Sequence, residues 1–153
     1  DSPKVQAIGT DLNPAAIELA RRNAYRHEVD DRVTFYEGDL FAPVPSAMIP
    51  ADVVCSNPPY VEDGAWPTLS PVIRLHEDRR ALLAGPDGLD IIRRLIGDAY
   101  PLLRPGGLLA FELGMGQYGE VADLLEKGGY MNIRFVKDLA GIKRVATAYR
   151  PEK

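Results

Sequence analysis

The tetrapeptide Asn57-Pro58-Pro59-Tyr60 contains the residue types best suited to chemistry in this chain. Proline after Asn57 favours an extended backbone at Asn57, and each proline fixes its own φ angle, so the loop is stiff. Because prolines lack a backbone N–H, the loop offers mainly carbonyl oxygens as hydrogen-bond acceptors. Acceptors with few donors, next to an aromatic ring, suit a planar –NH2 group. We therefore predict that Asn57, Pro58, Pro59 and Tyr60 form a catalytic site that acts on such a nitrogen.

The elements that must position this loop form an alternating pattern of strands and helices. Residues 52–56 are apolar and β-branched and predict a short buried strand ending at Asn57, with Cys55 as a small core residue. Asn13 and Pro14 predict the start of a helix over residues 15–25. Further strands are expected at residues 5–10, 33–36, 107–113, 132–136 and 144–149, further helices at residues 88–103 and 118–127, and a short helical pattern at residues 76–83. This alternation predicts an α/β fold with a mostly parallel sheet. The last two strands are joined too closely for a crossover, so we expect them to be antiparallel.

Two other polar signatures also follow expected strands. Asp11 comes directly after residues 5–10, and Asp39-Leu40 follow residues 33–36. Ligands of open α/β sheets bind at the carboxyl ends of the strands, so these residues and Asn57 are expected to lie at one edge. Asp11 could bind ribose hydroxyls. The alternative is that Asp11 is simply a carboxylate at a helix start, where the helix dipole favours negative charge. Asp39-Leu40 suit an adenine edge, with an ordinary turn as the alternative. Glu112, at the end of an apolar strand, is a further candidate acceptor.

Composition narrows the class of protein. The chain has 153 residues, 46% of them apolar, and a net charge of −4. These values fit one globular domain and argue against a broad nucleic-acid footprint. One cysteine and two histidines permit neither a disulfide framework nor zinc-ligand spacing. No signal peptide or membrane-spanning stretch is visible, so we expect a cytoplasmic protein with no metal and no membrane association.

Several motifs in order carry a resemblance to a known family. They are Asp11-Leu12-Asn13-Pro14, Gly38-Asp39-Leu40-Phe41, Asn57-Pro58-Pro59-Tyr60, Gly85-Pro86-Asp87-Gly88-Leu89-Asp90, residues 102–107, and Asp138-Leu139-Ala140-Gly141 with Arg144. Together they resemble the release-factor glutamine methyltransferases, the HemK family, over essentially the whole chain. The Asn-Pro-Pro-Tyr motif alone is shared with enzymes that methylate DNA adenine. The Gly-Leu-Asp and Asp-Leu-Ala-Gly segments favour the release-factor family over those DNA-methylating enzymes.

The resemblance implies a class I, Rossmann-like methyltransferase fold that uses S-adenosylmethionine. Asp11 would take the ribose hydroxyls with Leu12 beside it, and Asp39 and Leu40 would border the adenine. Asn57 would contact both cofactor and substrate, and the residues from Asn57 to Tyr60 would hold a glutamine amide beside the methyl group. The substrate would be the glutamine in the Gly-Gly-Gln loop of peptide chain release factors.

The sequence departs from the family pattern in two places. Asp78 follows Glu77 where the family usually has proline. The family's first strand, Gly-rich cofactor loop and helical N-terminal domain have no counterpart, so we expect residues 1–153 to be a catalytic domain truncated at its N-terminus. Three alternatives remain open: a glutamine methyltransferase acting on a ribosomal protein, an N6-adenine methyltransferase acting on DNA or RNA, and a non-catalytic remnant or binding module.

Overall fold

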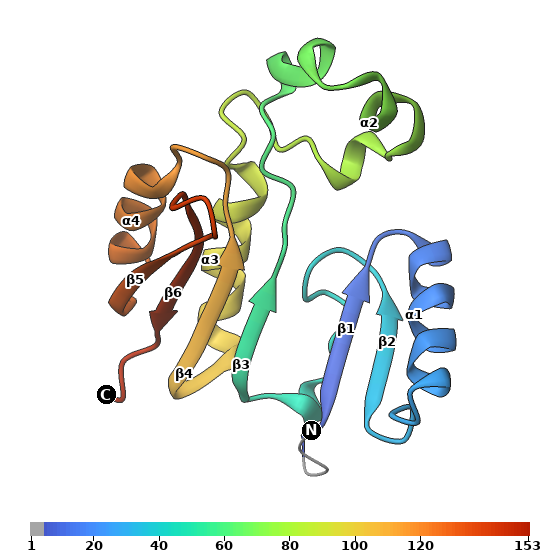
Figure 1. Ribbon diagram of the computed structural model, residues 1–153. Helices are drawn as coiled ribbons and strands as arrows, with labels where there is room; N and C mark the ends of the chain where they lie inside the picture. The colour runs from blue at the N-terminus through green and yellow to red at the C-terminus, as the bar shows by residue number, and fades with distance from the viewer. Residues whose placement is uncertain (1–4) are drawn as a thin grey trace. The chain divides into compact units, whose positions relative to one another are not determined.

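The computed structural model describes residues 5–153 and divides into two compact units, Asp1–Met48 and Ile49–Lys153. The elements in chain order are β1 (Ala7–Asp11), α1 (Pro14–Arg26), β2 (Val33–Glu37), η1 (Ser46–Met48), β3 (Ala51–Ser56), η2 (Asp63–Thr68), α2 (Pro71–His76), η3 (Arg79–Ala81), α3 (Asp90–Leu102), β4 (Leu103–Glu112), α4 (Tyr118–Lys127), β5 (Met131–Lys137) and β6 (Lys143–Tyr149) (Figure 1). The α/β fold class predicted from the sequence is confirmed.

The first unit is a parallel strand pair with one helix. β1 and β2 run in register from Ala7 opposite Val33 to Asp11 opposite Glu37. The predicted helix start is confirmed, because the Asn13 side chain accepts a hydrogen bond from the Ala15 N–H at 2.9 Å, with a proline at the first helical position. α1 contacts both strands, and its buried residues are Ile17 and Ala24.

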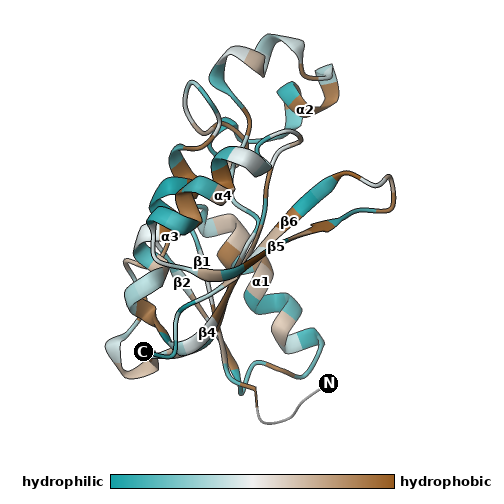
Figure 2. Cartoon of the chain, turned by 90° about the vertical axis from the view of Figure 1, so that its left-hand side faces the viewer, coloured by the Kyte–Doolittle hydropathy of each residue, from teal (hydrophilic) through white to brown (hydrophobic). Residues whose placement is uncertain are grey.

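The second unit is a mixed four-stranded sheet in the order β3-β4-β6-β5. β3 and β4 are parallel, whereas β6 is antiparallel to both β4 and β5, which confirms the predicted antiparallel pair at the C-terminal end. α3 packs on β4 and α4 on β5 and β6, and the two helices contact each other. Both therefore cover the same face of the sheet (Figure 2), and each helix buries apolar residues, including Ile92 in α3 and Val121 in α4. The largest fully buried side chains of this core are Phe111, Ile92, Leu95, Leu103, Leu109, Leu113, Leu125 and Val121.

The prediction that residues 52–56 form a buried strand with Cys55 in the core is wrong in part. β3 is present, but only Val54 is buried, while Val53 is 54% exposed and Cys55 is exposed. Side chains alternate across a strand, and Val54 lies beside Leu109 on the face that the helices of this unit cover. Val53 and Cys55 lie on the opposite face.

The segment after β3 also differs from expectation. A helix was expected over residues 76–83, but α2 ends at His76 and the short 3-10 helix η3 follows separately. Two helix starts explain the division. Ser70 Oγ accepts from the Ile73 N–H at 3.4 Å and Pro71 follows it, whereas the Asp78 carboxylate accepts from the Arg80 N–H at 2.9 Å. Each cap begins its own helical turn.

Candidate active site

The Asn57-Pro58-Pro59-Tyr60 loop leaves the carboxyl end of β3 and is anchored at its far end. The Val61 N–H donates to the Leu82 carbonyl at 2.8 Å, and the Ala84 N–H donates to the Val61 carbonyl at 2.9 Å. Pro58 is buried, whereas Asn57 is exposed. Within the described part of the chain no hydrogen-bond partner engages the Asn57 side chain. The loop thus combines a fixed backbone with a side-chain amide that is free to bind.

Tyr60 is held through its hydroxyl by the end of the neighbouring strand. The hydroxyl donates to Glu112 Oε1 at 2.7 Å, so Glu112 is the acceptor that its position after an apolar strand predicted. Partial burial raises the pKa of Tyr60 above its ordinary value, and the hydrogen bond and negative charge of Glu112 add to the increase, while Arg144 opposes it. Tyr60 therefore remains a hydrogen-bond donor at neutral pH.

The Tyr60–Glu112 pair predicts a measurable pH dependence. Because the pKa of folded Tyr60 lies above the ordinary 10.0, the stability contributed by this pair is full below pH 10 and is lost as pH rises through the raised pKa. Glu112→Gln removes the negative charge, so we expect the pKa of Tyr60 to fall toward its ordinary value. Tyrosinate absorbance followed against pH, with Tyr60→Phe identifying the signal of Tyr60, tests this expectation. Superimposable titrations of wild type and Glu112→Gln would contradict it.

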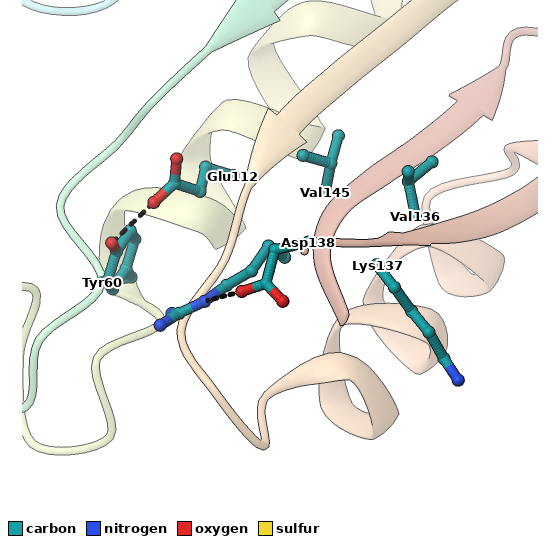
Figure 3. Close-up of a pocket in the computed structure, with 7 residues that line it drawn as sticks. Tyr60, Glu112, Val136, Lys137, Asp138 and Val145 are labelled. Atoms are coloured by element: carbon teal, nitrogen blue, oxygen red, sulfur yellow. Dashed lines mark hydrogen bonds and ion pairs between the residues drawn. The ribbon is translucent and has the colours of Figure 1, made fainter. Parts of the chain in front are cut away.

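A pocket of about 400 Å³ opens beside Tyr60 in the second unit (Figure 3). Its lining residues are Tyr60, Glu112, Val136, Lys137, Asp138, Arg144 and Val145. Tyr60 and Glu112 meet on one side, and Asp138 lies on the side formed by the hairpin of β5 and β6. Of the predicted catalytic tetrapeptide, the pocket contains Tyr60 alone.

The hairpin turn gives the Asp-Leu-Ala-Gly motif a structural role. Asp138 Oδ1 accepts from the N–H groups of Ala140 and Ile142, both at 2.9 Å, which closes the turn. Asp138 Oδ2 lies 3.6 Å from Arg144 Nε. The turn therefore holds Arg144 at the pocket rim, where its charge acts on Tyr60.

The predicted cofactor-binding residues of the first unit lie at the carboxyl ends of β1 and β2. Asp11 is exposed, and its Oδ1 accepts from the Asn13 N–H at 2.7 Å. The Gly38 N–H donates to the Asp11 carbonyl at 2.9 Å, which brings Asp39-Leu40 next to the end of β1. Leu12 is 50% exposed. The structure thus gathers Asp11, Leu12, Asp39 and Leu40, whereas their meeting with Asn57, in the second unit, stays a prediction.

The sequence analysis missed one residue that contacts the loop after β3. The Gln117 side chain contacts the backbone of Tyr60, Asp87, Gly88 and Gly114. No periodicity or motif singles out this glutamine, since its partners are up to 57 residues away. His76 and Glu77, weighed as possible site residues, are exposed at the end of α2 and do not line the pocket. Among residues 5–153 there is no group of three or more His, Cys, Asp or Glu residues placed to hold a metal.

The fold and the sequence match a family of methyltransferase domains. The chain matches the family described as "Methyltransferase domain" over residues 1–137, and it belongs to that family. A solved methyltransferase from Pyrococcus furiosus has the same fold, with a TM-score of 0.69 and 19% identity, covering 95% of this chain and 63% of that one.

Relatives in sequence identify a narrower family than the fold does, and they confirm the resemblance of the motifs to the release-factor glutamine methyltransferases. The release factor glutamine methyltransferase of Moorella thermoacetica is 42% identical over 152 residues, which are 99% of this chain and 53% of the relative. That of Gloeobacter violaceus is 40% identical over 148 residues, which are 96% of this chain and 51% of the relative. The chain therefore spans about half the length of these relatives. No helix within the described residues is long and apolar enough to cross a membrane.

Proposed function

We propose that this protein transfers a methyl group from S-adenosylmethionine to the side-chain amide of the glutamine in the Gly-Gly-Gln loop of peptide chain release factors. The observation that carries the proposal is the free, exposed amide of Asn57 on a loop fixed at the end of β3. Relatives about 40% identical over nearly the whole chain, named release factor glutamine methyltransferases, support the choice of substrate.

The residues of the first unit fit the ribose and adenine of S-adenosylmethionine. The Asn13 N–H engages only one oxygen of the Asp11 carboxylate. The exposed carboxylate therefore has acceptor sites left for a pair of ribose hydroxyls. Leu12 and Leu40 would supply apolar contacts and Asp39 an acceptor beside the adenine. When bound, the cofactor supplies a sulfonium methyl group as the electrophile.

The loop after β3 would orient the amide nitrogen of the substrate. An amide nitrogen is a poor nucleophile because its lone pair is delocalised into the carbonyl. The Asn57 side-chain oxygen and the Pro58 carbonyl would each accept one N–H, which aims the lone pair at the methyl group. Such positioning lowers a barrier by about 7–11 kcal/mol in well-oriented intramolecular reactions. The same acceptors bind more strongly as positive charge develops on the nitrogen.

Tyr60 would form the wall of this acceptor site. Its ring is restrained because Glu112 holds the hydroxyl. A ring held in this way would stack on the planar amide and exclude water. Its hydroxyl, already donating to Glu112, would not compete with the substrate nitrogen for the acceptors of the loop.

A transfer assay tests the proposed function. We expect the intact protein to move label from methyl-labelled S-adenosylmethionine to a release factor, and a factor whose Gly-Gly-Gln glutamine is replaced by alanine to stay unlabelled. A glutamine-bearing ribosomal protein and adenine-containing DNA and RNA serve as competing acceptors. Robust labelling of one of these, with none of the release factor, would contradict the proposed substrate.

A further inference from the structure

Gln117 joins three segments of the second unit that are far apart in the sequence. Its Nε2 donates to the Tyr60 carbonyl at 3.1 Å, to the Gly88 carbonyl at 3.3 Å and to the Asp87 carbonyl at 3.4 Å. Its Oε1 accepts from the Gly114 N–H at 2.7 Å. One side chain therefore connects the loop after β3, the turn before α3 and the loop after β4.

The surroundings of Gln117 fix the orientation of its amide. A backbone N–H faces Oε1, and carbonyl oxygens face Nε2. The reversed amide would place an oxygen against three carbonyls and an NH2 group against an N–H, losing every one of these bonds. The direction of the side chain is thus set by its partners.

The peptide group between Tyr60 and Val61 is held on both edges. Its carbonyl accepts from Gln117 Nε2, and its N–H donates to the Leu82 carbonyl at 2.8 Å. Gly88 also packs closely against this peptide group. A Cβ added to Gly88 would lie only 2.4 Å from the Tyr60 carbonyl oxygen. Without Gln117 the peptide plane loses one of its two hydrogen bonds, and its orientation is less restrained.

We propose that Gln117 is a positioning residue for the catalytic loop, acting through the Tyr60–Val61 peptide group. Together with Glu112, which holds the Tyr60 hydroxyl, it restrains Tyr60 at both its backbone and its side-chain end. The catalytic consequence rests on the proposed function. Misplacement of a reacting group by about 1 Å costs on the order of 10²-fold in rate, so loss of this restraint lowers kcat.

Two substitutions distinguish the acceptor function of Gln117 Oε1 from the donor function of Gln117 Nε2. Gln117→Glu keeps an oxygen for the Gly114 N–H but replaces the donor with an oxygen facing the Tyr60 carbonyl. Gln117→Met keeps a similar length and removes both functions. Asp123→Asn, an exposed change in α4, the helix for which Gln117 is the N-cap, is the matched control.

Amide hydrogen exchange, measured residue by residue in the intact protein without substrate, tests whether Gln117 restrains the Tyr60–Val61 peptide group. We expect Val61 to lose protection at least about 10-fold in both Gln117 variants, Gly114 to lose it in Gln117→Met alone, and Arg93 in α3 to stay unchanged. Val61 protection equal to wild type in both variants would overturn the proposal. So would loss of protection at Arg93 equal to that at Val61, because it would indicate general unfolding.

Steady-state kinetics with a release factor then tests the catalytic consequence. We expect kcat to fall on the order of 10²-fold in both variants, with the KM for S-adenosylmethionine unchanged. Unchanged kcat despite lost Val61 protection would overturn the proposal. If wild-type protein labels no release factor, the proposed function fails, and the exchange pattern alone decides the role of Gln117.

Discussion

Asn57→Ala is expected to reduce methyl transfer to a release factor by roughly 10²–10³-fold or more, the cost of removing one preorganised group that stabilises developing charge. The side chain supplies one of the two acceptors proposed for the substrate –NH2 group, and alanine leaves that N–H unpaired. The measurement is single-turnover label transfer with saturating cofactor and release factor. A rate within a few-fold of wild type would remove Asn57 from the catalytic site.

The same substitution should leave the fold intact. The Asn57 side chain is exposed and has no hydrogen-bond partner among residues 5–153, so its loss removes no native hydrogen bond there. We expect a melting temperature equal to that of wild type. Asn23→Ala makes the same chemical change at an exposed position in α1 and serves as the control for activity.

The parts of the fold predicted correctly depend on local signals. The helix over residues 118–127 was predicted with its observed bounds because Gly128 and Gly129 end it, and Gly128 is the C-cap of α4. Asn13 and Pro14 predicted the start of α1 because capping uses neighbouring backbone groups. The end of β3 just before Asn57 was predicted because prolines restrict the chain in any context.

The parts that were missed depend on tertiary packing. The exposure of Cys55 follows from which face of β3 is covered, and an apolar run does not encode that. The contacts of Gln117 join residues 30 and 57 positions away, so no window of sequence reveals them. The boundary near His76 depends on two helix caps, at Ser70 and Asp78, and the sequence prediction recognised neither of them.

The structure also explains a motif that only the family resemblance had singled out. Gly88 has a φ of +69°, a region that side chains other than glycine rarely adopt. A Cβ on Gly88 would lie 2.8 Å from Gln117 Nε2 and would also clash with the Tyr60 carbonyl oxygen. The glycine of the Gly-Leu-Asp segment is thus required by the contact that Gln117 makes with the loop after β3.

Asp11→Ala is expected to weaken S-adenosylmethionine binding by about 1.5–3 kcal/mol, the range for hydrogen bonds to a charged group. This corresponds to a dissociation constant raised about 10- to 150-fold. The physical reason is the loss of the exposed carboxylate proposed to accept the ribose hydroxyls at the end of β1. Calorimetric titration of the intact protein with the cofactor measures the change.

Alanine also removes the bond from the Asn13 N–H to Asp11 Oδ1, so a second variant must separate local structure from binding. Asp11→Asn keeps an oxygen for that N–H, loses the charge and replaces the second acceptor oxygen with an NH2 group. We therefore expect it to bind the cofactor more weakly than wild type and more tightly than Asp11→Ala. Glu18→Ala, which removes an exposed carboxylate from α1, should leave the dissociation constant unchanged. If Asp11→Ala binds as tightly as Glu18→Ala, the ribose site lies elsewhere.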